Sequence, residues 1–318
     1  MKIVVYDSYA VSQGDISWDC WDGLGDVTAY DRTAPEDTVS RGRGAEIVIT
    51  NKVVITRGIM EQLPDLRYIG VLATGFNVVD VAAASEFGIV VTNIPAYSTM
   101  SVAQMVFAHL LNIVNGVDRH ACSVRAGEWQ VAKDFSYSLS AQRELAGKTM
   151  GILGLGNIGM RTAVIANAFG MRVLAQTSKS ADELPDWIEK SECTDDLFRR
   201  SDVISLHCPL TDSTAGVVCR RTLSMMKPDA ILINTGRGPL VDEEALAEAL
   251  REHRIQAAAV DVLCEEPPRH GSPLVGLDNC YITPHIAWAT VEARKRLMQV
   301  AFDNVRMFIA GTPQNVVN

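Results

Sequence analysis

The chain has 318 residues, which is enough for two domains with separate cores, and 47% of them are hydrophobic and 21% charged. Its formal net charge is -9 and its pI is about 5.2. A nucleic-acid surface is excluded, because phosphate backbones are bound by clustered Lys and Arg.

The seven cysteines are scattered, and no two have the two-residue spacing of a zinc or redox motif. They are Cys20, Cys122, Cys193, Cys208, Cys219, Cys264 and Cys280. We expect reduced thiols, no metal site and a cytoplasmic location. The segment MKIVVYD is charged too early for a signal peptide. We also expect no membrane association, because the chain has no apolar run of spanning length.

The first hundred residues alternate between short apolar β-branched runs and helix-like segments. The runs predict strands over residues 3–6, 46–50, 67–73 and 89–92, with helices over 35–44, 56–63 and 78–87. Continuous apolar strands separated by helices are typical of a buried parallel sheet. We predict a small, doubly wound, flavodoxin-like α/β domain here.

A different pattern begins near residue 98. Helical spacing of apolar residues predicts one long helix from Ser98 or Thr99 to about Arg125. Strands are then predicted over residues 149–153, 171–175, 203–207, 230–234, 257–262 and 281–283. Six strands with intervening helices match a Rossmann dinucleotide-binding domain. A last helix, over residues 290–309, is predicted to pack back on the first domain. The predicted domains are therefore residues 1–98 with 287–318, and residues 99–286.

The motif GLGNIG fits the dinucleotide fingerprint G-x-G-x-x-G through Gly154, Gly156 and Gly159. An apolar strand precedes it and a helix follows it, which is the context that pyrophosphate binding requires. Asn157 and Ile158 begin that helix. The motif predicts NAD binding.

The acidic residue that usually bonds the ribose hydroxyls of NAD is missing from the end of the second strand of this domain. Thr177 and Ser178 stand there, followed by Lys179. NADP is therefore an open alternative, because no carboxylate repels a 2′-phosphate and Lys179 attracts one. The other interpretation is weaker NAD binding through the two hydroxyls.

Three chemically complementary residue types follow three predicted strands of this domain. Arg237 follows the fourth strand, the acids Glu265 and Glu266 follow the fifth, and His285 follows the sixth. Because ligands of open α/β sheets bind at the carboxyl ends of strands, we expect these residues to converge. Arginine holds a carboxylate with a planar fork, and a carboxylate-oriented histidine exchanges a proton with the substrate oxygen. Taken singly, each residue is typical of a solvated turn or a packed surface position.

Residues 153–159, 234–243, 261–267 and 283–288 together resemble the D-2-hydroxyacid dehydrogenase family, along nearly the whole chain. Residues 50–52, 70–77, 93–98 and 285–290 resemble its glycerate dehydrogenase branch, also called hydroxypyruvate reductases.

The resemblance implies a catalytic triad of Arg237, Glu266 and His285, and it selects Glu266 over Glu265 because the family's acid directly precedes proline. It also implies that backbone amides around Leu72, Ala73, Thr74 and Gly75 bind the substrate carboxylate. Lys52 and Trp288 are further candidates for substrate contacts, with a solvated lysine and interdomain packing as the alternatives.

The resemblance also implies a set of cofactor contacts: His207, Cys208, Pro209, Thr214, Thr235, Gly236, Asp261 and His285. Asp261 would bond the nicotinamide carboxamide. Gly236 departs from the Ala or Ser that is commoner there, which we expect to loosen the turn that holds Arg237.

The expected reaction is reversible reduction of hydroxypyruvate, and of glyoxylate, to D-glycerate and glycolate in a cleft between the domains. The long helix that includes Ser101 is expected to form much of a homodimer interface, although its apolar face fits packing inside one subunit equally. One alternative is another D-2-hydroxy acid, of lactate or phosphoglycerate type. Lys52 and Arg57 are the only cations near the first-domain loop that a phosphorylated substrate would use. A non-catalytic NAD sensor of the same fold is the second alternative.

Overall fold

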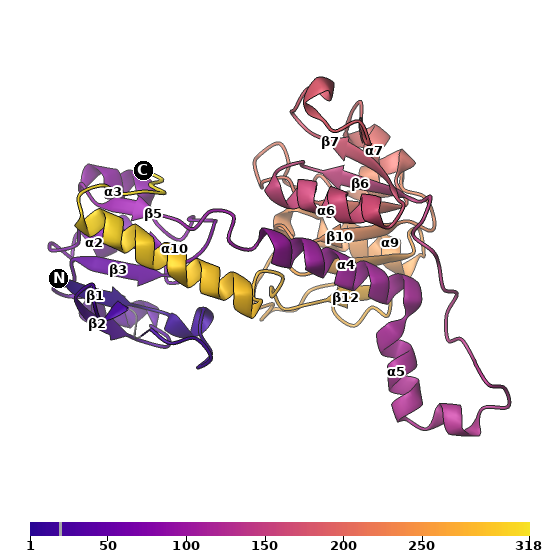
Figure 1. The fold of residues 1–318 in the computed structure, drawn as a ribbon, viewed down its shortest axis with the longest axis horizontal. Coiled ribbons are helices and arrows are strands. Elements are labelled where there is room, and N and C mark those ends of the chain that lie inside the picture. Colours follow the sequence, from indigo (N-terminus) through magenta and orange to yellow (C-terminus); the bar gives the residue numbers. More distant parts are fainter. Residues whose placement is uncertain (19–20) are drawn as a thin grey trace. The chain divides into compact units, whose positions relative to one another are not determined.

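The computed structural model describes residues 1–18 and 21–318, so the predicted free thiol of Cys20 lies outside the described residues. The chain divides into two units, Met1–Ser98 with Ala289–Asn318, and Thr99–Trp288 (Figure 1). The second crossing falls after Trp288, two residues beyond the position predicted from the sequence. The cause is Asp261, whose carboxylate accepts the backbone N–H groups of Ile286 and Ala287 and so keeps them in the second unit.

The first unit contains a five-stranded sheet of order β2-β1-β3-β4-β5, in which every pair of neighbours is parallel. This order is that of flavodoxin-like domains. The strands are β1 (Lys2–Val5), β2 (Asp26–Ala29), β3 (Ile47–Thr50), β4 (Tyr68–Val71) and β5 (Val90–Thr92). The helices are η1 (Ser8–Ala10), η3 (Pro35–Asp37), α1 (Thr38–Gly42), α2 (Arg57–Met60), α3 (Val81–Glu86) and α10 (Val291–Ile309).

Both edges of this sheet differ from the sequence prediction. Strand β2 is an additional edge strand, and no residue of its DVTA segment is fully buried. The sequence analysis missed it because a short, half-exposed strand carries no continuous apolar run. At the other edge, the chain's C-terminal residues pair with β5 through a bridge between Thr92 and Val316 and a hydrogen bond from Val317 N to Val91 O. This pairing covers an edge that would otherwise be exposed.

Helices cover both faces of the first sheet. One face packs against α2 and α3, in a cluster that includes Val48, Ile69 and Ala84. The other face packs against α10, whose Phe308 ring lies 4.7 Å from the ring of Tyr68. Thr290 caps α10 by accepting the N–H of Ala293. The predicted return of the last helix to the first domain agrees with this arrangement.

The second unit contains a seven-stranded parallel sheet of order β12-β11-β10-β9-β6-β7-β8. Its strands are β6 (Thr149–Leu153), β7 (Arg172–Gln176), β8 (Ile188–Lys190), β9 (Val203–Leu206), β10 (Ile231–Asn234), β11 (Ala257–Val260) and β12 (Cys280–Ile282). Its helices are α4 (Thr99–Asn115), α5 (Val117–Arg125), η4 (Glu128–Val131), α6 (Asn157–Ala168), η5 (Ala181–Glu183), α7 (Thr194–Arg200), α8 (Arg220–Leu223), η6 (Gly238–Leu240) and α9 (Glu243–Arg251).

The six predicted strands of this unit are present, and β8 is an addition at the sheet edge. Its sequence is IEK, too short and too polar to stand out as a strand. The strands stay parallel, but their order along the sheet switches between β6 and β9, and this switch point is where doubly wound domains bind their ligands. The predicted fold class, a Rossmann domain with a smaller flavodoxin-like domain, is confirmed.

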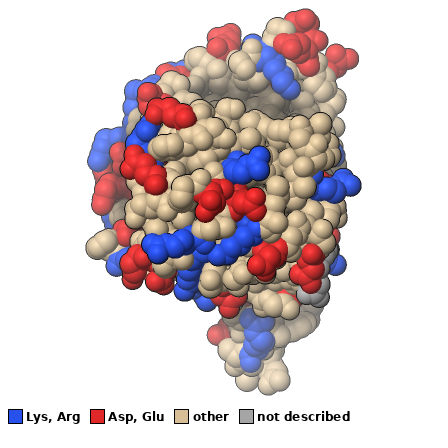
Figure 2. Space-filling model, turned by 90° about the vertical axis from the view of Figure 1, so that its left-hand side faces the viewer, with Lys and Arg blue, Asp and Glu red and all other residues tan. Residues whose placement is uncertain are grey.

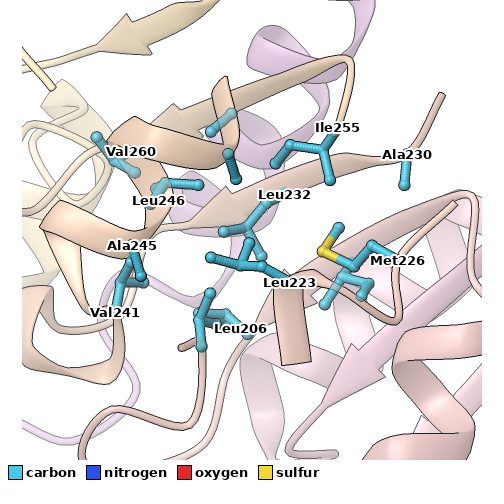
Figure 3. Packing of buried hydrophobic residues seen from close by; sticks show 14 of the residues in the cluster. Leu206, Leu223, Met226, Ala230, Leu232, Val241, Ala245, Leu246, Ile255 and Val260 are labelled. Atoms are coloured by element: carbon cyan, nitrogen blue, oxygen red, sulfur yellow. The ribbon is translucent and has the colours of Figure 1, made fainter. Parts of the chain in front are cut away.

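Alternate residues of the central strands point to two separate cores. Leu206, Leu232 and Val260 belong to a cluster shared with α7, α8 and α9. Ile152, Ile233 and Ala259 belong to the opposite cluster, shared with α4 and α6. Figure 3 shows part of the first cluster, where side chains from β10, α8 and α9 point toward one another. Burial on both faces explains why these strands read as continuous apolar runs.

The long helix predicted to reach Arg125 is two helices. They are separated by Gly116, which adopts a left-handed conformation with φ of 59°, and they meet at 61°. Helix α4 lies in the core, whereas α5 and the segment after it extend away from the rest of this unit (Figure 1). Among the described residues no single helix is long and apolar enough to cross a membrane. Only α4 and α5 taken together, which are bent relative to each other, reach that length and apolar composition.

The surface and the cysteines agree with the composition. On the face shown in Figure 2, acidic and basic side chains are intermingled. The six described cysteines are all free thiols.

Candidate active site

The glycine loop between β6 and α6 uses its three glycines differently. Gly154 has φ of +97°, and a Cβ there would lie 2.5 Å from the backbone nitrogen of Cys208. A Cβ at Gly159 would lie 2.1 Å from the carbonyl oxygen of Gly154. Gly156, by contrast, is exposed and has no atom within 4 Å of its Cβ position. The outer glycines therefore close the turn, and the middle one leaves open space beside the helix.

That open space faces the start of α6, a twelve-residue helix with no side-chain cap. Asn157 is exposed and Ile158 half-buried in its first turn. The first N–H groups of a helix have no intrahelical acceptor and carry the positive end of the helix dipole. A glycine without neighbours beside uncapped amides is suited to the approach of a pyrophosphate.

Two oxygen atoms at the carboxyl ends of strands of the second sheet are buried without a hydrogen-bond partner in the described part of the chain. One is Oγ1 of Thr235, directly after β10, and the other is Oε1 of Gln176, the last residue of β7. Buried polar atoms are nearly always satisfied, so each is available to a ligand. Thr235 was predicted as a cofactor contact. Gln176 was missed, and its place at a strand end is the signal that would have found it.

The residues after β7 lie around the position of the missing acid. Thr177 is half-buried, and its hydroxyl accepts the backbone N–H of Lys179. Ser178 and Lys179 are exposed. The side chain of Lys190, in the additional strand β8, donates to the carbonyl oxygen of Lys179 at 2.5 Å. Two lysines therefore lie at this corner of the sheet edge.

His207 and its neighbours form the loop after β9. Burial lowers the pKa of His207 to about 4, so the imidazole is neutral at physiological pH, and its Nε2 lies 2.8 Å from Oγ of Ser205. Burial raises the pKa of the Cys208 thiol, which is therefore a poor nucleophile. The hydroxyl of Thr214 donates to the carbonyl of Pro209 at 2.6 Å and closes the loop.

His285 and Glu266 are in direct contact. Nδ1 of His285 lies 2.6 Å from Oε2 of Glu266, and Oε1 of the same carboxylate accepts the N–H of Leu263 at 2.9 Å. Because a carboxylate only accepts, we assign the imidazole proton to Nδ1, which leaves Nε2 to exchange a proton with a ligand. The structure thus brings together two members of the predicted triad.

The neighbouring acid has a different partner. Glu265 Oε1 lies 2.8 Å from Nδ1 of His270, whose side chain is 87% exposed. The side chain of His285 is 29% exposed, so the Glu266 pair is the more protected of the two. The geometry therefore separates two acids that are adjacent in the sequence.

The backbone of His285 is held in an uncommon conformation, with φ of 54°. A non-glycine residue in this left-handed region costs about 1–2 kcal/mol and persists only where the surroundings fix it. The carboxylate of Asp261, which is 1% exposed, provides that support. It accepts hydrogen bonds from Thr283 Oγ1 at 2.5 Å, Ile286 N at 2.9 Å and Ala287 N at 2.8 Å.

This finding changes how Asp261 is understood. The resemblance implied a bond from its carboxylate to the cofactor, and three hydrogen bonds within the protein already use three of the roughly four positions at which a carboxylate accepts. In the structure, its main contacts are with the backbone on either side of His285.

Arg237 is exposed at the end of β10, and its Nη1 donates to the carbonyl of Gly236 at 2.8 Å. Among the contacts of the described residues, its guanidinium does not join the pair of His285 and Glu266. Two residues that the sequence analysis missed fix its backbone. Asn234 donates to Arg237 O and accepts from Gly236 N. A Cβ at Gly238 would lie 2.1 Å from the backbone of Leu263, so this glycine lets the Arg237 turn approach the segment that carries Glu266.

In the first unit, the loop after β4 presents backbone amides. Thr74 is exposed. Its hydroxyl donates to Ile94 O, and its carbonyl oxygen accepts from the side-chain amide of Asn93. Leu72 is buried, and its carbonyl accepts from Asn51 at 2.6 Å. Within the described residues, the N–H groups of Ala73, Thr74 and Gly75 have no acceptor. Successive unpaired amides in a bend form a nest for an anion.

The two remaining candidates have different surroundings. Lys52 is exposed in the first unit, on a loop fixed by Asp7, whose carboxylate accepts the N–H groups of Asn51 and Lys52. Burial raises the pKa of Asp7, and these hydrogen bonds oppose that rise. Trp288 is half-buried at the last position of the second unit. Across residues 1–18 and 21–318, no group of three or more His, Cys, Asp or Glu side chains is arranged to hold a metal ion.

The glycine loop, the uncapped helix and the orphaned oxygens of Gln176 and Thr235 fit a nicotinamide dinucleotide along the carboxyl edge of the second sheet. The second unit is therefore a dinucleotide-binding domain of Rossmann type.

Comparison with known proteins agrees with this class. The family model described as D-isomer specific 2-hydroxyacid dehydrogenase, NAD binding domain, matches residues 107–287. The chain is 45% identical to a hydroxypyruvate reductase from Blautia hydrogenotrophica over 100% of both chains. It is 43% identical to a glycerate dehydrogenase from Methylorubrum extorquens, over 91% of this chain and 90% of that relative. A solved acyclic imino acid reductase in complex with NADPH and D-Arg is 32% identical, with a TM-score of 0.86 over 100% of both chains.

The chain belongs to the D-isomer specific 2-hydroxyacid dehydrogenase family, as its motifs predicted.

Proposed function

We propose that this protein reduces hydroxypyruvate, and more slowly glyoxylate, to D-glycerate and glycolate, and catalyses the reverse oxidations. The observation that supports this most directly is the 2.6 Å contact between His285 and Glu266 at the carboxyl edge of the Rossmann sheet. That contact supplies an oriented proton donor, and the two curated relatives described above are named for hydroxypyruvate and glycerate.

His285 acts as the acid and base in this proposal. A nicotinamide dinucleotide, when bound, supplies the hydride. Protonated His285 gives its Nε2 proton to the C2 oxygen of the oxo acid as the carbon is reduced, and it takes the proton back in the oxidation. Glu266 holds Nδ1 and stabilises the imidazolium, so the ring keeps one orientation through both directions.

Arg237 binds the substrate carboxylate and polarises the carbonyl. Within the described residues its guanidinium bonds only its own turn, through the carbonyl of Gly236, so it is available to reorient toward an anion. The amide nest of Ala73, Thr74 and Gly75 is assigned to the same carboxylate. Lys52 and Trp288 are assigned secondary contacts with the substrate.

The assignment of Arg237 is tested by Arg237→Lys. Lysine keeps the charge and loses the planar fork, so kcat/KM for hydroxypyruvate should fall by about 100-fold, or about 3 kcal/mol, with the melting temperature unchanged. Near-normal turnover in this variant would overturn the role. Arg251→Lys, in α9, is the matched control and should leave turnover unchanged.

Cofactor preference follows from the corner formed by Thr177, Ser178 and Lys179. We propose that the protein uses both NADH and NADPH, because no acid stands at positions 177–179 and Lys179 and Lys190 lie beside them. The carboxylate of Glu183, which accepts from Ser180 and interacts with both lysines, offsets only part of their charge. His207, Cys208, Pro209, Thr214, Thr235, Gly236 and Asp261 are assigned to the remainder of the dinucleotide site.

The test of the function is loss of absorbance at 340 nm from NADH and, separately, from NADPH, with hydroxypyruvate, glyoxylate and pyruvate at equal concentration. Fastest oxidation with hydroxypyruvate supports the proposal, and fastest oxidation with pyruvate moves it to the lactate type. Binding of dinucleotide with no turnover of any oxo acid, 3-phosphohydroxypyruvate included, would leave a sensor as the function.

We also propose a cytoplasmic homodimer. Helix α5 and the segment after it project from the second unit (Figure 1) and expose large apolar side chains, with Val131 82% and Phe135 91% exposed. Val117, Val124 and Trp129 of the same projection are exposed as well, and several exposed apolar side chains on one segment, unlike a single one, are typical of an interface. The double variant Val131→Ser, Phe135→Ser should give a monomer by light scattering, whereas Val275→Ser, at a site 59% exposed elsewhere, should not. If the double variant remains a dimer, as the control does, the interface lies elsewhere.

A further inference from the structure

The segment that carries His285 is attached to helix α4 at two points. Oγ of Ser101 donates to the carbonyl of Ala287 at 2.5 Å. Nε2 of His109, two turns further along α4, lies 3.1 Å from Oγ1 of Thr283. Both side chains are almost fully buried, Ser101 at 5% and His109 at 7% exposed. The two attachments therefore bracket His285 from within the core of the second unit.

The hydrogen bonds at His109 have one consistent direction. Thr283 Oγ1 lies 2.5 Å from Oδ1 of Asp261, and a carboxylate only accepts, so the threonine proton belongs to that bond. Thr283 must then accept from His109, which places a proton on Nε2 of the imidazole. Burial lowers the pKa of His109, and the nearby carboxylate of Asp261 opposes this.

On its other side, Asp261 holds the chain just beyond His285. Its oxygens accept the N–H groups of Ile286 and Ala287, at 2.9 Å and 2.8 Å. The series from His109 through Thr283 to Asp261 thus fixes the backbone before and after the residue at φ of 54°. A residue in that conformation stays there only while its neighbours are fixed.

We infer that His109 is a positioning residue: through Thr283 and Asp261 it holds residues 283–287 so that His285 keeps its backbone conformation and its contact with Glu266. The effect on turnover rests on the proposed function, whereas the effect on the loop does not. Neither the sequence motifs nor the resemblance assigns a role to His109.

A matched pair of substitutions separates the hydrogen bond from the space that the ring fills. His109→Gln keeps an N–H donor at about the distance of Nε2, and His109→Leu fills similar space without a donor. Amide hydrogen exchange of a peptide that covers residues 283–290 should be faster by about tenfold or more in the Leu variant. The Gln variant should exchange at nearly the wild-type rate.

Turnover provides the second measurement. Loss of a residue that orients an active group typically reduces activity by about 10–100-fold. We therefore expect kcat with hydroxypyruvate to fall about tenfold in His109→Leu and to return within about threefold in His109→Gln. The Kd for NADH and the KM should change less than about twofold. The deuterium isotope effect on kcat, measured with NADH labelled at the transferred position, should rise in the Leu variant, because the chemical step becomes slower than product release.

The outcomes separate the possibilities. Unchanged exchange in the Leu variant, or equally fast exchange in both variants, overturns the inference. The inference is also overturned if kcat falls only in proportion to a lower melting temperature while the isotope effect stays unchanged. Faster exchange in the Leu variant alone, with no turnover by the wild-type protein, leaves the loop role standing and removes the proposed function. If His109→Leu does not fold, Thr283→Val against Thr283→Ser interrupts and restores the same series at its next member.

Discussion

The two halves of the carboxyl edge of the second sheet use their polar groups in opposite ways. Near β6 and β7, hydrogen-bonding groups lack partners among the described residues: the start of α6 is uncapped, and Gln176 Oε1 is buried without a bond. Near β11 and β12, the corresponding groups already have partners inside the protein, since Asp261 accepts three hydrogen bonds and each oxygen of Glu266 accepts one.

This difference distinguishes binding from positioning. Groups left open can be satisfied by a ligand, so substitutions near β6 and β7 should change affinity. Groups satisfied inside the protein hold a reacting side chain in place, so substitutions near β11 and β12 should change rate.

The largest expected effect is on rate, from His285→Gln. General acid–base catalysis contributes about 100- to 10,000-fold, so kcat with hydroxypyruvate should fall by about 1,000-fold. The Kd for NADH, measured by fluorescence, should change less than about twofold, because the glycine loop is untouched.

The chain offers a matched control for this substitution. His270 also contacts a glutamate, with 2.8 Å between its Nδ1 and Glu265 Oε1, but it is 87% exposed. His270→Gln should leave kcat unchanged. Equal losses in the two variants would mean that neither pair is the acid, and a tenfold loss of NADH affinity in His285→Gln would remove the division between the two halves of the edge.

The next largest effect is on the pH dependence of stability. It comes from His207, which lies after β9, between the two halves of the sheet edge. Burial lowers its pKa to about 4, below the value near 6.5 of an unfolded histidine. Between these values the unfolded state binds more protons, so stability rises with pH and is lost as the pH falls from about 6.5 to 4. This contribution amounts to about 2–3 kcal/mol. Urea unfolding at pH 7 and pH 4.5 should therefore show a smaller difference in His207→Gln than in wild type. An unchanged difference would mean that the imidazole is not buried neutral.

The third effect separates two glycines of one loop. Gly159→Ala places a Cβ against the Gly154 carbonyl oxygen, so the free energy of unfolding should drop by about 1–3 kcal/mol. Gly156→Ala meets no atom, so stability should be kept while the Kd for NADH rises about tenfold, or about 1.4 kcal/mol. Thermal unfolding and NADH titration of both variants measure this. A reversed pattern would place the dinucleotide away from Gly156.

Much of the carboxyl edge of the second sheet could be predicted, because the sequence patterns that indicate it lie within short segments. The strand predicted over residues 149–153 matches β6 at both ends, since a strand buried on both faces leaves a continuous apolar run. The two missed strands, β2 and β8, lie at sheet edges, where short polar segments leave no such run. The break between α4 and α5 had a signal, Gly116, but a glycine within an apolar helical pattern is also tolerated without a break.

The positioning residues could not be predicted, because their contacts join distant parts of the sequence. His109 and Thr283 are separated by 174 residues, and Thr283 and Asp261 by 22. Nothing in the local sequence distinguishes His109 from a packed core histidine. The choice of Glu266 over Glu265 also came from the family resemblance, since two adjacent acids offer the same chemistry until their partners are placed.

The smallest expected effect is at Gly236, where the sequence analysis expected a glycine to loosen the Arg237 turn. The structure gives this glycine no positive φ, and a Cβ there would lie 3.5 Å from its nearest neighbours, which is ordinary contact. The turn is already fixed by Asn234, which accepts the N–H of Gly236 and donates to Arg237 O. Gly236→Ala should therefore stabilise the protein by about 0.4–1 kcal/mol, by reducing the freedom of the unfolded chain.

Turnover measurements of Gly236→Ala show whether backbone flexibility at Gly236 is needed for catalysis. Arg237 has to leave the carbonyl of Gly236 to reach a substrate carboxylate, and that movement belongs to its side chain if the turn is as rigid as the bonds of Asn234 indicate. In that case Gly236→Ala keeps kcat/KM within about twofold while raising the melting temperature by a few degrees. If kcat/KM falls more than tenfold at raised stability, the backbone of the turn moves with Arg237, and the glycine is there to allow it.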